Sequence, residues 1–161
     1  MHGDFHFPQW SYSLGGEIKL NDFNKASILT FNEKEGEYCY VDHCYRGSYR
    51  SPEDNRCSSH VNEGSDTFSL GNNFYALLTG FRPHYEWTGK KRDLYGQIGE
   101  GLKLPYIDDR YRNRSDVEST LVKLMEACWV YDKRERASVF DVLKELYTLR
   151  DRENARRNAI S

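Results

Sequence analysis

Three short strings in the sequence carry residues that could do chemistry together. They are His2-Gly3-Asp4, Asp22-Phe23-Asn24 and Ser51-Pro52-Glu53, and the first two aspartates are eighteen positions apart (22 − 4). A carboxylate can accept the proton of a hydroxyl, and carboxylate oxygens are the hard ligands that Mg²⁺ prefers. Taken singly, each aspartate is more typical of a turn or a helix N-cap. A functional interpretation therefore depends on the strings occurring in series.

A second group of residues has the chemistry of a zinc site. Cys39, Cys44, Cys57 and His60 follow one another with the spacing Cys-x4-Cys-x12-Cys-x2-His. His43 is an additional possible ligand. Tetrahedral zinc would order the polar segment that contains them. The paired Cys-x2-Cys of many zinc modules is absent, and the site would enclose Ser51-Pro52-Glu53 in its loop. A zinc-stabilised loop module is therefore the weaker alternative.

Further strings lie downstream in a recognisable order. Gly80 is followed by Pro83, and Cys128-Trp129 is followed by Asp132 and Arg136. Together with the first three strings, this series resembles the protein kinase family from its catalytic loop to the end of its C-terminal lobe. The first three strings resemble the family's His-Arg-Asp, Asp-Phe-Gly and Ala-Pro-Glu. The Cys-Trp string is commonest in tyrosine kinases and tyrosine-kinase-like kinases.

The resemblance implies ATP and Mg²⁺ as cofactors and a protein hydroxyl as the phosphate acceptor. Asp4 would act as the catalytic base, with His6 beside it in the catalytic set. Asp22 would bind Mg²⁺, and Gln9 would supply another metal ligand through its amide oxygen. The cofactor-binding residues would then be Gln9, Asp22, Phe23 and Asn24.

Four positions depart from the family pattern. Gly3 replaces the arginine that pairs with a phosphorylated activation loop. His6 replaces a lysine of Ser/Thr kinases with a side chain that is mostly neutral at pH 7. Gln9 replaces asparagine and Asn24 replaces glycine; because asparagine tolerates a positive φ, we expect Asn24 to preserve the turn. These departures make a pseudokinase or interaction module without efficient catalysis the main alternative to an active kinase.

The resemblance also implies a structural set, which consists of His2, Ser51, Pro52, Glu53, Asp66, Trp129 and Arg136. Glu53 and Arg136 are expected to form a buried ion pair that ties the activation segment to the last helices. Asp66 is expected to accept hydrogen bonds from backbone amides near the catalytic loop.

Hydrophobic periodicity predicts the elements that would position these residues. Gly15-Gly16 separates two alternating stretches, over 10–14 and 17–21, as in a β-hairpin. The polar stretch over 31–64 indicates a long loop, and 25–50 would be the activation loop. Helical spacing predicts helices over 65–80, around 92–98, from Ser115 and from Ser138, and the charged tail over 151–161 is expected to fray.

The predicted fold is mainly α within the α+β class. It consists of one partial kinase domain over 1–150, a C-lobe with a small hairpin before Asp22 and a long activation loop. We expect the N-lobe to be absent, because the sequence shows no Gly-rich loop and no lysine-bearing strand before His2. The chain would then be a fragment of a kinase and inactive by itself.

The composition is that of one globular domain. The chain has 161 residues, of which 38% are hydrophobic, and a net charge of −2, as is typical of a single domain with its own core. The balanced charge argues against nucleic-acid binding, and no apolar run is long enough for a membrane span. Four cysteines are too few for a disulfide scaffold, which favours a reducing, cytoplasmic setting. The expected partner is a protein substrate or another binding protein.

Overall fold

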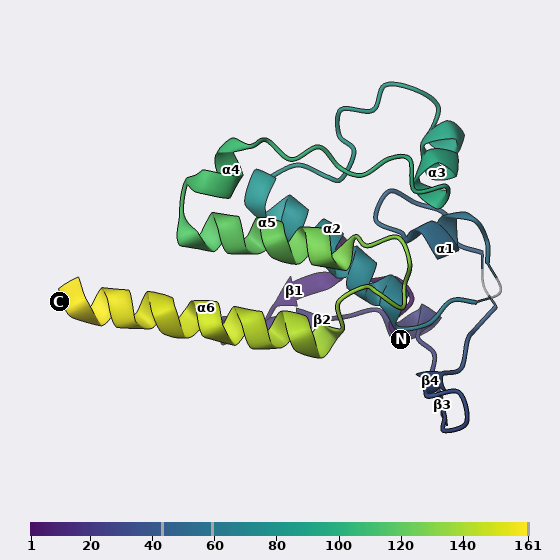
Figure 1. The fold of residues 1–161 in the computed structure, drawn as a ribbon, viewed down its shortest axis with the longest axis horizontal. Coiled ribbons are helices and arrows are strands. Elements are labelled where there is room, and N and C mark those ends of the chain that lie inside the picture. Colours follow the sequence, from purple (N-terminus) through teal and green to yellow (C-terminus); the bar gives the residue numbers. More distant parts are fainter. Residues whose placement is uncertain (43, 59, 161) are drawn as a thin grey trace.

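The computed structural model describes residues 1–42, 44–58 and 60–160, so His43, the spare ligand of the zinc hypothesis, lies outside the described residues. The described part is mainly helical (Figure 1), as the sequence predicts. Its helices are α1 (Pro52–Asn55), α2 (Gly64–Thr79), α3 (Lys91–Gly99), α4 (Arg110–Asn113), α5 (Asp116–Cys128) and α6 (Val139–Ile160). Its strands are β1 (Trp10–Tyr12), β2 (Ile18–Leu20), β3 (Phe31–Asn32) and β4 (Glu37–Tyr38). None of these helices combines the length and the apolar character needed to cross a bilayer.

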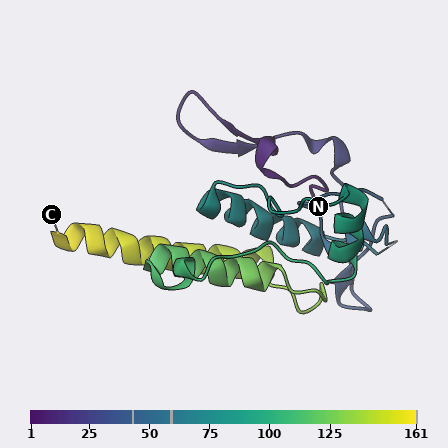
Figure 2. The same ribbon diagram turned by 90° about the horizontal axis from the view of Figure 1, so that it is seen from above.

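The helix α2 lies in the middle of the molecule. Figure 2 shows it between the β1–β2 hairpin on one side and the layer of α5 and α6 on the other. The core between these layers is one cluster of buried side chains, made of Phe68, Phe74, Tyr75, Val122, Leu124, Met125, Cys128, Trp129 and Val142. The buried helix predicted over 65–80 is therefore confirmed.

Two glycines explain how α2 packs and where it ends. A Cβ at Gly71 would lie 2.8 Å from both Cys128 Cβ and Trp129 Nε1, so a glycine is needed for α5 to approach this closely. Gly80 ends the helix with φ 75°, and its amide donates to the Ala76 carbonyl. Left-handed glycine caps of this kind are common at helix C-termini.

The hairpin predicted around Gly15-Gly16 is present. Strands β1 and β2 pair antiparallel, with Trp10 opposite Leu20 and Tyr12 opposite Ile18. Gly16 takes a φ of 80° in the turn. The hairpin leads directly from one string of candidate site residues to the next, so it sets their relative position.

The segment over 31–64 contains more regular structure than the predicted loop. The strands β3 and β4 form a second small hairpin, and Val41 pairs with Val61 in an isolated bridge. Helix α1 begins at a capping box, in which Ser51 and Asp54 exchange side-chain-to-backbone hydrogen bonds. These short elements could not be predicted from the sequence, because a two-residue strand is too short to show an alternating hydrophobic pattern.

The structure does not support the zinc hypothesis. Cys44 and Cys57 are joined by a disulfide, so two of the four proposed ligands are bonded to each other. Cys39 is exposed with a free thiol. Among the described residues, no group of three or more histidine, cysteine, aspartate or glutamate side chains is arranged to hold a metal ion.

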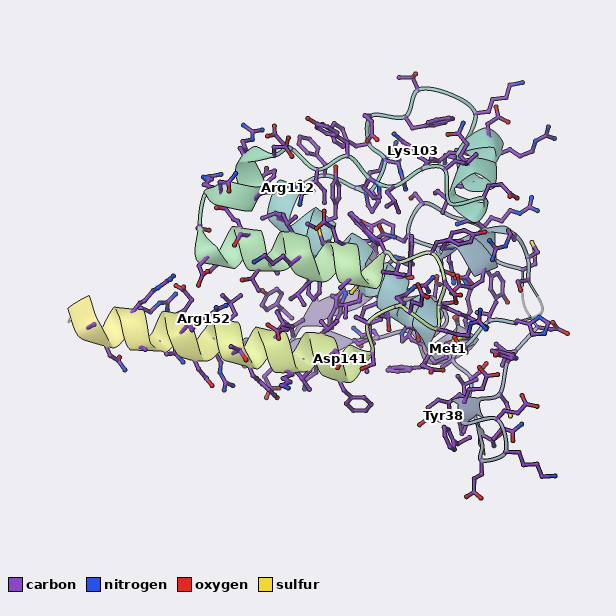
Figure 3. All side chains as sticks on the ribbon, in the orientation of Figure 1. Met1, Tyr38, Lys103, Arg112, Asp141 and Arg152 are labelled. Carbon is purple, nitrogen blue, oxygen red and sulfur yellow. A yellow bond between two sulfur atoms is a disulfide. The ribbon has the colours of Figure 1, made fainter. Side chains whose placement is uncertain are left out.

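The last two helices begin where the sequence predicts. The hydroxyls of Ser115 and Ser138 accept hydrogen bonds from the Glu118 and Asp141 amides, respectively, as N-caps. Helix α6 then continues to residue 160, so the charged tail over 151–160 is helical in the structure. Two ion pairs explain the extra length, because Arg152 and Arg156 both reach Asp116 at the start of α5, and Figure 3 shows Arg152 on the side of α6 that faces α5.

Candidate functional site

The string His2-Gly3-Asp4 is held in place by the N-terminal turn of α2. The Asp66 carboxylate accepts hydrogen bonds from the backbone amides of His2 and, at 3.0 Å, of Gly3. Burial raises the pKa of Asp66, although these two amides act to lower it. The carboxylate expected to bind amides near the catalytic loop therefore does so across 63 positions of sequence.

The His2 side chain joins the first two candidate strings. Its Nε2 lies 2.9 Å from the Asn21 carbonyl, and its Nδ1 accepts the Asp4 amide at 3.3 Å. Because Nδ1 accepts, the ring proton belongs on Nε2, where it can be donated to Asn21. The His2 ring also contacts the Phe23 ring at a centroid distance of 4.9 Å.

Three basic side chains surround the buried Asp4 carboxylate. Lys25 Nζ lies 2.7 Å from Oδ2, and Arg50 contacts Oδ1. His6 Nε2 is 3.5 Å from the same Oδ1. Arg50 also donates to the Gly3 carbonyl, so its buried guanidinium is fixed by two partners. The carboxylate thus faces two permanent cations, one more positive charge than it can balance.

This surplus of positive charge determines the protonation of the group. Burial raises the pKa of Asp4, but the hydrogen bond from Lys25 and the charge of Arg50 outweigh it and hold the pKa below its usual value. Burial lowers the pKa of His6, and the two cations lower it further against the opposing effect of Asp4. At neutral pH, Asp4 is therefore charged and His6 is neutral.

The structure explains why Gly3 does not carry the family's arginine. Its φ is 71°, in the left-handed region that favours glycine. A Cβ at this position would lie 2.5 Å from the Lys25 carbonyl oxygen. Any side chain at Gly3 would therefore collide with the backbone that presents Lys25 to Asp4.

Asp22 and Gln9 form the second half of the site. Gln9 Nε2 donates to Asp22 Oδ2 at 3.1 Å and lies 3.4 Å from His6 Nε2. A continuous series of side-chain contacts therefore connects Asp4, His6, Gln9 and Asp22. Their oxygens are of the hard type that Mg²⁺ binds, and rotation of the Gln9 amide would bring its carbonyl oxygen to Asp22. The residues present fit a magnesium ion in their donor chemistry.

The turn in this string is present, but Asn24 does not adopt the positive φ expected of it. The residue with a positive φ in this string is Asp22, at 62°, while Phe23, Asn24 and Lys25 form a 3-10 turn. The left-handed conformation therefore moves two positions earlier, to the aspartate itself. Aspartate tolerates this conformation better than most residues, because its short polar side chain can bond locally.

Glu53 and Arg136 meet in the interior below this site. The two guanidinium nitrogens of Arg136 lie 2.7 and 3.2 Å from the two Glu53 oxygens. The Arg136 guanidinium also donates to the carbonyls of Gly64, Val130 and Tyr131. Burial raises the pKa of Glu53, but the hydrogen bonds and charge of Arg136 outweigh it and keep the carboxylate ionised.

The remaining members of the structural set pack around this pair. The Ser51 hydroxyl donates to the Ser65 hydroxyl, which donates to Glu53 at 3.0 Å. Pro52 is the buried first residue of α1. The Trp129 ring lies against Tyr75 at a centroid distance of 6.2 Å. The set therefore joins α1, α2 and the α5–α6 connection around one ion pair.

Sequence reasoning missed Lys25, Arg50 and the tyrosine beside them. Both cations lie over the face of the Tyr45 ring, at 4.8 and 5.4 Å from its centroid. Each directly adjoins a string that was singled out, since Lys25 follows Asn24 and Arg50 precedes Ser51. The sequence did contain a signal for them. The chain lacks the family's usual arginine and lysine, and a basic residue lies directly beside each of two acidic motifs.

Comparison with known proteins gives the same family as the motifs. The sequence matches the protein kinase domain over residues 12–148, a range that includes Asp22, Glu53 and Arg136 and begins after Gln9. It is 26% identical over 154 residues to a probable serine/threonine-protein kinase of Dictyostelium discoideum, covering 96% of this chain and 22% of that protein. It is 28% identical over 140 residues to the probable serine/threonine-protein kinase KCC4 of Saccharomyces cerevisiae, covering 83% and 12%. A Raf homolog serine/threonine-protein kinase of Caenorhabditis elegans is 29% identical over 82 residues, covering 51% and 10%. The chain thus spans about a fifth or less of the length of these curated relatives.

Proposed function

The chain belongs to the protein kinase domain family, and on that premise we propose that the protein carrying it transfers the γ-phosphate of ATP to a hydroxyl group of a protein substrate. The observation that supports this proposal is the series of contacts from Asp4 through His6 and Gln9 to Asp22. It brings a charged carboxylate for the acceptor hydroxyl and a carboxylate for Mg²⁺ into one site.

Asp4 is the proposed base. Its pKa lies below the usual value, so it is ionised at neutral pH and can accept a hydrogen bond from the acceptor hydroxyl. A carboxylate has about four acceptor positions, so the contacts with Lys25 and Arg50 leave room for one more donor.

Asp22 is the proposed Mg²⁺ ligand, with Gln9 beside it. Bound Mg²⁺ would neutralise charge on the ATP phosphates. Lys25 and Arg50 are proposed to supply the positive charge near the transferred phosphate that Gly3 and His6 cannot supply. Phosphoryl transfer depends mainly on positioning and charge neutralisation. It therefore does not matter which positions of the sequence supply these cations.

A pseudokinase is the second candidate, and one observation favours it. Both oxygens of Asp4 already have basic partners in this conformation, Lys25 on one and Arg50 on the other. If these contacts persist when nucleotide binds, the two cations hold the pKa of Asp4 low and make the carboxylate a poor acceptor for the hydroxyl proton. The protein would then bind partners without efficient catalysis.

The test is Mg²⁺-dependent transfer from radiolabelled ATP by the full-length native protein. The Asp22→Asn variant should lose transfer by at least about 100-fold, because the metal loses its charged ligand. The matched control is Asp151→Asn, which removes an exposed carboxylate on α6 and should leave the rate unchanged. ATP-dependent thermal stabilisation without any transfer would support the pseudokinase instead. Transfer at the wild-type rate by Asp22→Asn would contradict the metal-binding and cofactor-binding roles of Asp22.

A further inference from the structure

The connection between α2 and α3 surrounds a pocket with an excess of positive charge. The pocket has a volume of about 190 Å³, and its lining includes Ser48, Arg82, His84, Trp87 and Lys91. It lies beside the first turn of α3, and α3 is the helix at the upper right of Figure 1. No aspartate or glutamate is among the residues that line it.

The basic side chains around this pocket have no ion-pair partner among the described residues. Among the described residues, no carboxylate forms an ion pair with Arg82, Lys90, Lys91 or Arg92. Three of these cations are consecutive and stand at the N-terminal end of α3. That end of a helix carries partial positive charge, so cations are unfavourable there and anions are stabilised. Asp93 in the first turn offsets only part of this charge.

A buried histidine in the lining provides an independent observation. His84 is only 3% exposed, and its Nδ1 has no hydrogen-bond partner among the described residues. Its backbone is held at φ 58°, in the left-handed region that non-glycine residues adopt uncommonly. The neighbouring Glu86 pairs with Lys103 at 3.0 Å, and its charge also acts on His84, whose pKa burial nevertheless lowers to about 4.

The pocket is joined to the Asp4 site by three consecutive residues. Ser48 lines the pocket, and the Tyr49 ring contacts the His6 ring at a centroid distance of 5.9 Å. Arg50 then pairs with Asp4. A peptide with its acceptor hydroxyl at Asp4 would therefore pass close to the pocket within a few residues.

We propose that this pocket binds an anionic side chain of the protein substrate, a carboxylate or a phosphate, a few residues from the acceptor hydroxyl. The inference rests on the proposed function for the identity of the ligand as a substrate. Arg82, Lys91 and the first turn of α3 supply the charge, and His84 and Trp87 form part of the wall. The site would select acidic or previously phosphorylated substrates.

The test is peptide binding to the 161-residue chain, which needs no catalysis. Fluorescent peptides with a central serine or tyrosine carry glutamate, phosphoserine or the neutral glutamine at each flanking position in turn. At one or more positions, the glutamate or phosphoserine peptide should bind at least about fivefold more tightly than its glutamine counterpart, since charge-assisted hydrogen bonds are the stronger kind. Comparison of the two anionic series shows whether carboxylate or phosphate is preferred.

The variant Arg82→Gln/Lys91→Gln should reduce this preference to less than twofold. The matched control, Lys123→Gln/Arg150→Gln, removes the same charge from α5 and α6 and should keep the preference intact. Thermal melts establish that each variant is folded. Equal binding of charged and neutral peptides, no binding of any peptide, or a preference that survives in Arg82→Gln/Lys91→Gln would overturn the proposal. A retained preference in a full-length protein that transfers no phosphate would instead refute the proposed catalytic function alone.

Discussion

Two ionic clusters of the molecule differ in their balance of charge. At Glu53–Arg136, one carboxylate meets one guanidinium, and the two side chains are 4% and 0% exposed. At Asp4, one carboxylate of 10% exposure meets both Lys25 and Arg50. The first cluster is closed and electrically matched, whereas the second retains a surplus positive charge beside a neutral histidine.

This difference fits a structural role for the first cluster and the ligand-binding role that we propose for the second. A buried pair with every donor satisfied gains nothing from a further charge. A cluster with surplus positive charge attracts an anion such as a phosphoryl group. The same distinction applies at the pocket beside α3, where unpartnered cations again gather.

The largest expected effect is acid unfolding, because acid removes both clusters together. The pKa values of Asp4 and Glu53 are lowered by folding, so their stabilisation is present above the unfolded pKa and is lost as pH falls through the folded values. Asp66 acts in the opposite sense, because burial raises its pKa. Urea midpoints should therefore fall between about pH 5 and pH 2. A constant midpoint over this range would show that neither cluster matters for stability.

Removing the guanidinium of the matched pair comes next. Arg136→Ala should lower the free energy of unfolding by about 3–5 kcal/mol, because Glu53 would remain buried without its partner. Arg134→Ala is the control, since its ion pair with Asp132 has an arginine that is 76% exposed and its loss should be much smaller. Urea denaturation measures both, and equal losses would contradict the structural role of the buried pair.

A smaller loss of stability is expected when one cation is removed from the cluster of Asp4, Lys25 and Arg50. Arg50→Gln removes the hydrogen bonds to Gly3 and Asp4 and should cost about 1.5–3 kcal/mol. The pKa of Asp4 should rise, which carboxylate NMR titration would detect, and Arg50→Lys should restore part of the shift. An unchanged pKa would mean that Arg50 does not influence this carboxylate.

The smallest effect concerns the backbone that presents Lys25. Gly3→Ala should cost about 1–2 kcal/mol from the left-handed conformation, and the contact with the Lys25 carbonyl adds to it. Gly36→Ala is a suitable control, since its φ is 69° and nothing lies within 4 Å of the added Cβ. If thermal melts show the same loss of stability for Gly3→Ala and Gly36→Ala, the contact between the added Cβ and the Lys25 carbonyl does not contribute.

The sequence predicted the longer helices α2, α3, α5 and α6 and the β1–β2 hairpin, because their signals are local. Ser115 and Ser138 cap helices, Gly80 ends one, and Gly15-Gly16 marks the hairpin. The cations at Asp4 were not predicted, because Lys25 and Arg50 are 21 and 46 residues away in sequence and converge only in the folded chain. The left-handed residue of the second string was also misplaced, since local propensity favours asparagine and aspartate almost equally.

The chain's tail and its long polar segment show the same limit. Near the end of α6, Arg156 reaches Asp116 on another helix, a contact that no local pattern contains. The Cys44–Cys57 bond likewise depends on how the segment folds back on itself. Tertiary contacts, rather than propensity, determine both features.

The most direct test of the account is phosphate transfer by the full-length protein carrying Asp4→Asn. The substitution keeps the shape of the side chain and removes the charge that Lys25 and Arg50 surround. The account predicts a loss of transfer of at least about 100-fold, in a variant that still melts cooperatively and still binds Mg²⁺–ATP. Transfer at the wild-type rate by a folded Asp4→Asn protein would show that the cluster of Asp4, Lys25 and Arg50 is not the site of phosphate transfer.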